Sequence, residues 1–128
     1  MEKVISTKIR DKVLKHLLEK GYNINQQEYN PNIYFTYTPY GKRLIFAFTT
    51  NSILIIEYVI LRKSKTLGIK ALREIVNKLN LKSSIMKFTI EKKVILSMET
   101  RLQNVYNKKE FQRVLDDIKH DFSGLLEE

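Results

Sequence analysis

The sequence predicts a single α+β domain in which three helices accompany a five-stranded antiparallel sheet, in the order α-β-β-β-α-β-β-α. Three observations predict this class. Apolar residues recur at helical spacing in three segments, β-branched and aromatic residues dominate five others, and short turn sequences join successive strands. A length of 128 residues fits one domain, which we expect to span residues 1–128.

The first helix is predicted near the amino terminus, and Lys20-Gly21 provides its stop signal. Its apolar face consists of residues three or four positions apart: Ile5, Ile9, Val13, Leu14, Leu17 and Leu18. Residues 22–32 are rich in Asn and Gln and end in Asn30-Pro31-Asn32. We expect this segment to form a long loop.

Three strands are predicted next, over residues 33–38, 44–49 and 53–61, with turns at residues 39–42 and 50–52. The third strand is apolar at successive positions and therefore on both faces. Strands of this kind are usually covered on both sides. We therefore expect residues 53–61 to lie in the centre of the sheet.

The second helix is predicted to begin at Ser64 or Thr66 and to end near Asn80, with an apolar stripe of Leu72, Ile75, Val76 and Leu79. A hairpin of residues 86–90 and 94–99 follows. The third helix begins where Asn107 and Glu110 have the spacing of a capping box. Its stripe consists of Phe111, Val114, Leu115, Ile118 and Phe122.

Residues 72–98 resemble a known family. Glu74-Ile75-Val76-Asn77-Lys78-Leu79-Asn80 ends a helix with two asparagines, and Lys87-Phe88-Thr89-Ile90 then begins a hairpin. This pattern resembles the YbjN family, which shares its fold with the class I type III secretion chaperones. The resemblance implies a non-enzymatic protein associated with stress or regulation. The likeness to the chaperones implies a homodimer that holds an extended stretch of a client protein.

No residue pattern in the chain indicates an enzyme, a metal site or a cofactor. The chain has no cysteine, its four glycines are isolated, and His16 and His120 lie in separate predicted helices. Asp116, Asp117 and Asp121 fall on the polar side of the third helix, where we expect solvated carboxylates. The longest apolar run, residues 53–61, contains Glu57 and is too short to cross a bilayer, so we expect no membrane partner and a cytoplasmic protein.

The first functional expectation is the binding of a protein or peptide client. Three amphipathic helices are few for covering both faces of a five-stranded sheet, and apolar surface left exposed marks an interaction site. The alternative is a closed monomer in which the helices suffice. The candidate surface residues lie on the second and third predicted strands: Ile45, Ile53, Ile55 and Val59.

The second functional expectation is nucleic-acid binding. The chain has a formal net charge of +9, and residues 62–93 contain ten basic residues against two acidic ones. Such a segment can hold phosphates, although lysine enrichment also arises from base composition. The candidate residues lie in a loop, on an exposed helix face and at a hairpin tip: Arg62, Lys63, Lys65, Lys70, Arg73, Lys92 and Lys93.

Overall fold

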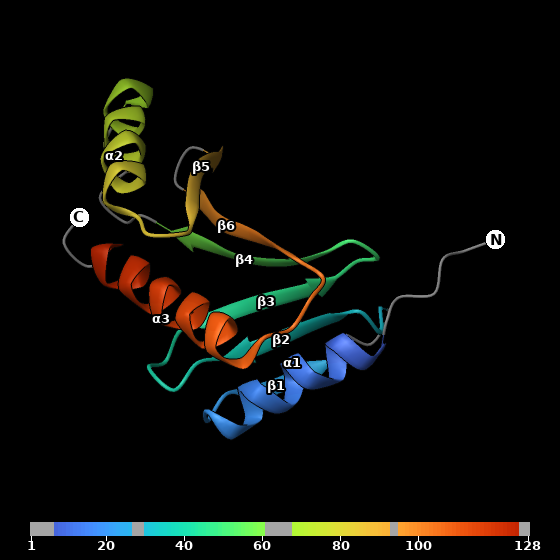
Figure 1. Ribbon diagram of the computed structural model, residues 1–128. Coiled ribbons are helices and arrows are strands. Elements are labelled where there is room, and N and C mark those ends of the chain that lie inside the picture. Colours follow the sequence, from blue (N-terminus) through green and yellow to red (C-terminus); the bar gives the residue numbers. More distant parts are fainter. Residues whose placement is uncertain (1–6, 27–29, 61–67, 93–94, 126–128) are drawn as a thin grey trace. The chain divides into compact units, whose positions relative to one another are not determined.

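The computed structural model describes residues 7–26, 30–60, 68–92 and 95–125, which form three helices and six strands (Figure 1). Their bounds in chain order are α1 (Thr7–Glu19), β1 (Asn23–Gln26), β2 (Ile33–Tyr37), β3 (Arg43–Phe48), β4 (Ser52–Ile60), α2 (Ile69–Lys82), β5 (Lys87–Lys92), β6 (Ile95–Gln103) and α3 (Lys108–Leu125). No helix in these described ranges is long and apolar enough to cross a membrane.

The strands form an open antiparallel sheet in the order β1-β2-β3-β4-β6-β5. The α+β class and the interior position of β4 are confirmed, whereas the prediction of five strands is wrong. The additional strand, β1, lies in the segment expected to be a loop, and its residues Asn23 to Gln26 pair with Tyr37 to Tyr34 of β2. Asn and Gln have low strand propensity, but pairing with a neighbouring strand outweighs propensity in this segment.

The chain divides into two compact units. The first consists of Met1–Ile56 with Arg101–Glu110, and the second of Glu57–Thr100 with Phe111–Glu128. Each unit takes one segment from the carboxyl-terminal part of the chain, so neither is a continuous stretch. Because neither unit is a continuous part of the chain, a single domain over residues 1–128 stays our prediction.

In the first unit, α1 contacts β1 and buries Val13 and Leu17 completely. The predicted stop at Gly21 is confirmed. Gly21 has a φ of +86°, and the backbone N–H of Tyr22 donates to the carbonyl of Leu17 at 3.0 Å, which closes the helix as a Schellman motif. The left-handed conformation explains why a glycine follows Lys20.

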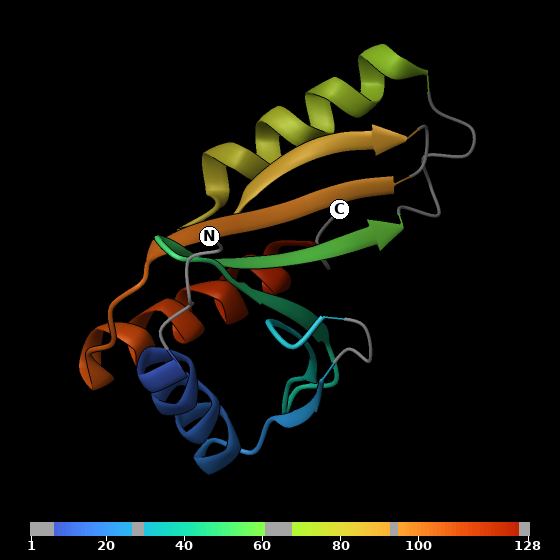
Figure 2. The same ribbon diagram turned by 90° about the vertical axis from the view of Figure 1, so that its right-hand side faces the viewer.

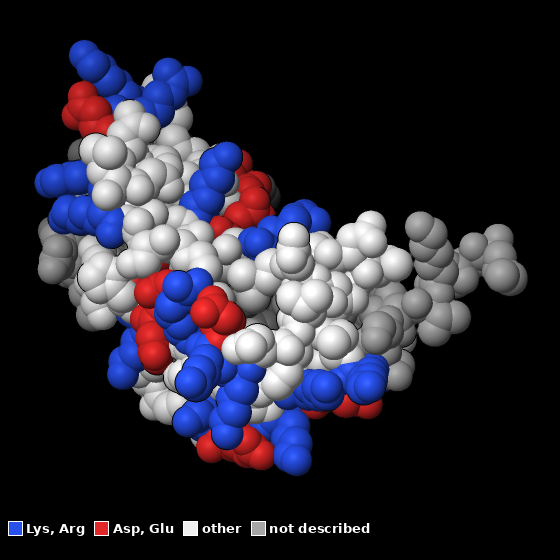
Figure 3. Space-filling model, viewed as in Figure 1, with Lys and Arg blue, Asp and Glu red and all other residues white. Residues whose placement is uncertain are grey.

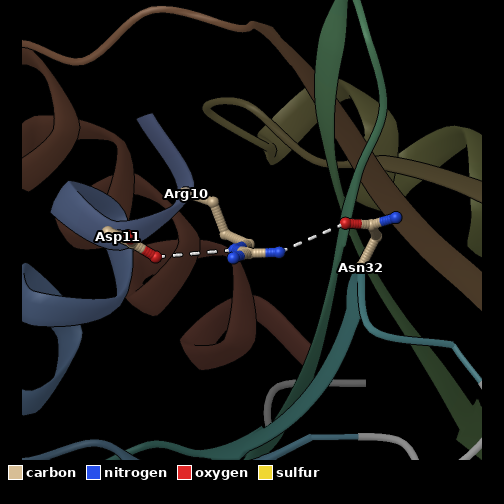
Figure 4. Close-up of polar contacts among 3 residues, drawn as sticks. All are labelled: Arg10, Asp11 and Asn32. Atoms are coloured by element: carbon tan, nitrogen blue, oxygen red, sulfur yellow. Dashed lines mark hydrogen bonds and ion pairs between the residues drawn. The ribbon is translucent and has the colours of Figure 1, made fainter. Parts of the chain in front are cut away.

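A polar contact also links α1 to the chain before β2 (Figure 4). Arg10 Nη1 donates to Asn32 Oδ1 at 3.5 Å, and Arg10 Nε lies 3.5 Å from Asp11 Oδ1. Both distances are long for such contacts, and Asp11 is exposed to solvent, so these contacts contribute little to stability. Apolar burial along α1 and the sheet supplies most of the stabilisation in this unit.

In the second unit, α2 lies along β5 (Figure 2). Gly68 is the N-cap of α2, whereas the start predicted at Ser64 or Thr66 falls outside the described residues. The helix buries Leu72, Val76 and Leu79 as its stripe predicts. The cap predicted for α3 is confirmed, because the backbone N–H of Glu110 donates to Asn107 Oδ1 at 3.1 Å.

Candidate functional site

The strands of the first unit place apolar side chains in two rows on one face of the sheet. Ile45 of β3 stands opposite Phe35 of β2 and Ile56 of β4, and Ala47 stands opposite Ile33 and Leu54. Directly opposite residues of antiparallel strands share a face, so the rows are neighbours. We call these six residues the outer face: Ile33, Phe35, Ile45, Ala47, Leu54 and Ile56.

All six side chains of the outer face are half-buried and retain contact with solvent. The alternating residues on the opposite face of the same strands are buried instead. Tyr34, Phe46 and Ile55, which stand in register, are 7%, 0% and 0% exposed. The sheet of the first unit therefore has one fully buried side and one apolar side that is partly open.

Polar and amphipathic residues border the outer face. Tyr37 of β2 stands opposite Arg43 of β3 and is 50% exposed. Asn25 and Asn23 of β1 stand opposite Phe35 and Tyr37. An apolar centre with a polar rim is the usual composition of a protein interface.

The structure corrects the residues expected to form a protein-binding surface. Ile53 and Ile55 are 0% exposed and belong to the core, so they offer no surface to a partner. Val59 is half-buried, and its spacing from Ile53 and Ile55 along β4 puts it on the same face of the strand as these two residues. Of the expected set, only Ile45 lies on the outer face, where its register partner in β4 is Ile56.

The basic segment is described only in part. Arg62, Lys63, Lys65 and Lys93 lie outside the described residues, and Lys92 is described only as the last residue of β5. Lys70 and Arg73 are exposed on α2, as are Lys78 and Lys82. The described structure thus confirms an exposed basic helix face.

The carboxylates of α3 differ from one another in their surroundings. Asp116 is exposed and accepts a hydrogen bond from Gln112 Nε2 at 3.0 Å. Asp121 is only 3% exposed, which corrects the expectation that all three carboxylates are solvated. Its Oδ1 accepts from the backbone N–H of Ser84 at 2.6 Å. Its Oδ2 accepts from those of Ile85 at 3.0 Å and Met86 at 2.8 Å.

These three bonds give Asp121 a structural role, since they hold the chain between α2 and β5. His120 beside it is exposed, whereas His16 is 3% exposed and its Nδ1 lies 2.9 Å from Tyr106 Oη. Within the described ranges, no group of three or more His, Cys, Asp or Glu side chains could hold a metal ion.

Leu54 and Ile56 were missed as candidate surface residues, although the sequence contains a signal for them. Phe46 and Phe48 alternate with Ala47 in one strand, and the larger side chains mark the buried side. Aligning Ile53 with Phe48 and Ile55 with Phe46 would have assigned Leu54 and Ile56 to the other side. That register depends on the length of the turn at residues 49–51.

No protein-family model, curated protein or solved structure matches the chain.

Proposed function

We propose that the protein is a non-enzymatic, chaperone-like binding module that holds an extended protein or peptide client on the outer face. The observation that carries this proposal is the register of β2, β3 and β4, which aligns six half-buried apolar side chains. A client that covers them removes apolar area from water, which contributes about 25 cal/mol per Å². The proposal includes a YbjN-like identity, a homodimer and a cytoplasmic location.

The partner follows from the chemistry of this surface. The outer face is built from Ile, Leu, Phe and Ala, so it complements apolar side chains, while the exposed hydroxyl-bearing side chain of Tyr37 lies at its rim. Unfolded chains expose many apolar side chains, so they fit such a surface.

A charge introduced into the outer face tests the proposal. We would measure the binding of a permanently unfolded protein, reduced and carboxymethylated lactalbumin, by fluorescence anisotropy. Leu54→Asp should weaken binding by at least about thirtyfold, because a carboxylate desolvated in the interface costs about 2 kcal/mol or more. Thr50→Asp adds the same charge in the exposed turn between β3 and β4 and should leave binding unchanged.

Two further measurements support this test. Leu54→Thr keeps a side chain that is compatible with a strand and removes apolar area, so it should also weaken binding. This variant keeps the test valid if Leu54→Asp lowers the stability of the fold. Light scattering reports the oligomeric state of the same variants. If Leu54→Asp converts a dimer into a monomer, the outer face is the contact between copies and the proposal of a client site there is wrong.

Nucleic-acid binding is the second candidate, and the exposed basic residues of α2 favour it: Lys70, Arg73, Lys78 and Lys82. It predicts that the affinity for a single-stranded oligonucleotide falls steeply with salt, because bound cations are released from the phosphates. Replacing Lys70 and Arg73 by Gln should reduce the salt slope by about two. Binding without a salt slope would exclude this candidate.

A further inference from the structure

A depression in the first unit is lined mainly by basic side chains. Its volume is about 290 Å³, and its lining residues are Lys12, Lys15, His16, Glu19, Tyr106 and Lys108. The first four lie at positions i, i+3, i+4 and i+7 of α1, so one helix face presents them together. Basic side chains gather over the region of α1 in the surface view (Figure 3).

The three lysines of the depression have no close counter-charge among the described residues. Within the described ranges, neither Lys12, Lys15 nor Lys108 has a carboxylate oxygen within ion-pair distance, and Glu19 has no cation within that distance. The lining carries three positive charges and one negative charge. Mutual repulsion among the ammonium groups is therefore only partly offset by Glu19.

The amino terminus of α3 adds partial positive charge beside Lys108. Lys108 is the first residue of α3, where the backbone N–H groups carry partial positive charge. Cations are favoured at the opposite end of a helix, so Lys108 stands where its own charge is disfavoured. A bound anion, in contrast, would be attracted both by the Lys108 ammonium group and by the amino terminus of α3.

A buried polar pair forms part of the lining. The His16 ring is 3% exposed, its Nδ1 lies 2.9 Å from Tyr106 Oη, and the two rings meet edge to face at 77°. The pair fixes the phenol ring where it borders the depression.

We propose that this depression binds a small anion that carries phosphate groups. Three lysine ammonium groups match the multiple acceptor oxygens and the charge of such a group. The volume lies at the lower end of the range for small-molecule pockets, which favours a small anion over a macromolecule. This site uses none of the outer-face residues and is independent of the proposed client binding.

Inorganic pyrophosphate is the probe for the test, and the full chain is used. Backbone amide NMR should show saturable shifts at residues 12–19 and 106–108, and calorimetry gives the dissociation constant. Lys12→Gln, Lys15→Gln and Lys108→Gln should each weaken binding by about tenfold, since each removes a charge-assisted hydrogen bond. Lys109→Gln is the matched control, because Lys109 is exposed beside Lys108 and does not line the depression. It should change the affinity by less than about twofold.

Three results would overturn the proposal. Equal weakening by Lys109→Gln and Lys108→Gln would show a response to overall charge instead of a site. Shifts that do not saturate, or that sulfate and chloride reproduce at the same ionic strength, would show nonspecific screening. A single-stranded oligonucleotide that binds the same residues more tightly than pyrophosphate would assign the depression to a macromolecule.

Discussion

The side-chain amide of Asn80 pairs with the backbone of Phe88 as a neighbouring strand would. The backbone N–H of Phe88 donates to Asn80 Oδ1 at 2.7 Å, and Asn80 Nδ2 donates to the Phe88 carbonyl at 3.0 Å. Phe88 lies in β5, the last strand of the sheet. Unpaired edge groups attract other chains, so this contact both stabilises β5 and protects its edge at Phe88.

Asn80→Ala should destabilise the fold by about 1 kcal/mol, because two hydrogen bonds to the edge strand are lost while water partly replaces them. Chemical unfolding measures this change. Asn77→Ala is the control, since Asn77 is exposed on the same helix, and it should change stability by less than about 0.5 kcal/mol. Equal effects of the two substitutions would contradict the role given to Asn80.

Asp121→Ala should cost about 2 to 3 kcal/mol, because three backbone N–H groups lose a charged acceptor in a buried position. Asp116→Ala removes an exposed carboxylate from the same helix and should cost less than about 0.5 kcal/mol. Amide hydrogen exchange gives a second readout: Ile85 and Met86 should lose protection only in Asp121→Ala. Unchanged protection there would show that Asp121 does not hold this segment.

Burial raises the pKa of Tyr40 from its ordinary value of 10.0 to about 12, and the nearby side chains of Tyr22 and Thr38 act in the lowering direction. The folded state therefore holds this proton more tightly than the unfolded state. The resulting stabilisation is complete below pH 10 and is lost as the pH rises to about 12.

Tyr40→Phe should lose stability less steeply than the wild type across that pH range, because it lacks the titrating phenol. Chemical unfolding at successive pH values measures the difference. Tyr58→Phe removes a phenol that is 46% exposed and should keep the wild-type slope. Parallel curves for the wild type and Tyr40→Phe would refute the assignment.

Gly21→Ala should destabilise the protein by about 1 kcal/mol, since a left-handed backbone disfavours a β-carbon. The added atom itself has room, because its nearest neighbour, Pro39 Cγ, would lie at 3.5 Å. Gly124→Ala is a useful comparison, because Gly124 lies in α3, where alanine is favoured over glycine, and an added β-carbon has open space around it. Thermal unfolding should show a clear loss only for Gly21→Ala.

Much of the fold follows from local sequence patterns, and the differences have physical causes. Val13 and Leu17 identify the buried side of α1, and Asn107 identifies the start of α3, because both signals act over a few residues. Strand β1 escaped prediction because its stability comes from pairing with β2. The role of Asp121 depends on amides 35 to 37 positions away, which no spacing pattern contains.

The candidate site illustrates the same distinction. A strand with apolar residues at successive positions indicates that both faces are apolar, but not which face is buried. That assignment requires the register of β3 against β4, which places Ile45 opposite Ile56 and Phe46 opposite Ile55. Ile45 of β3 was thus assigned to the partly open side correctly, whereas Ile53 and Ile55 of β4 were assigned to the wrong side.

Methyl NMR of the protein with labelled Ile and Leu side chains, titrated with the unfolded lactalbumin, tests the central claim most directly. We expect the methyl signals of Ile33, Ile45, Leu54 and Ile56 to shift or broaden as the client is added. Those of Ile53 and Ile55, which are 0% exposed, should remain nearly unchanged. Perturbation confined to residues of α2, or the absence of any change on the outer face at saturating client, would contradict the account.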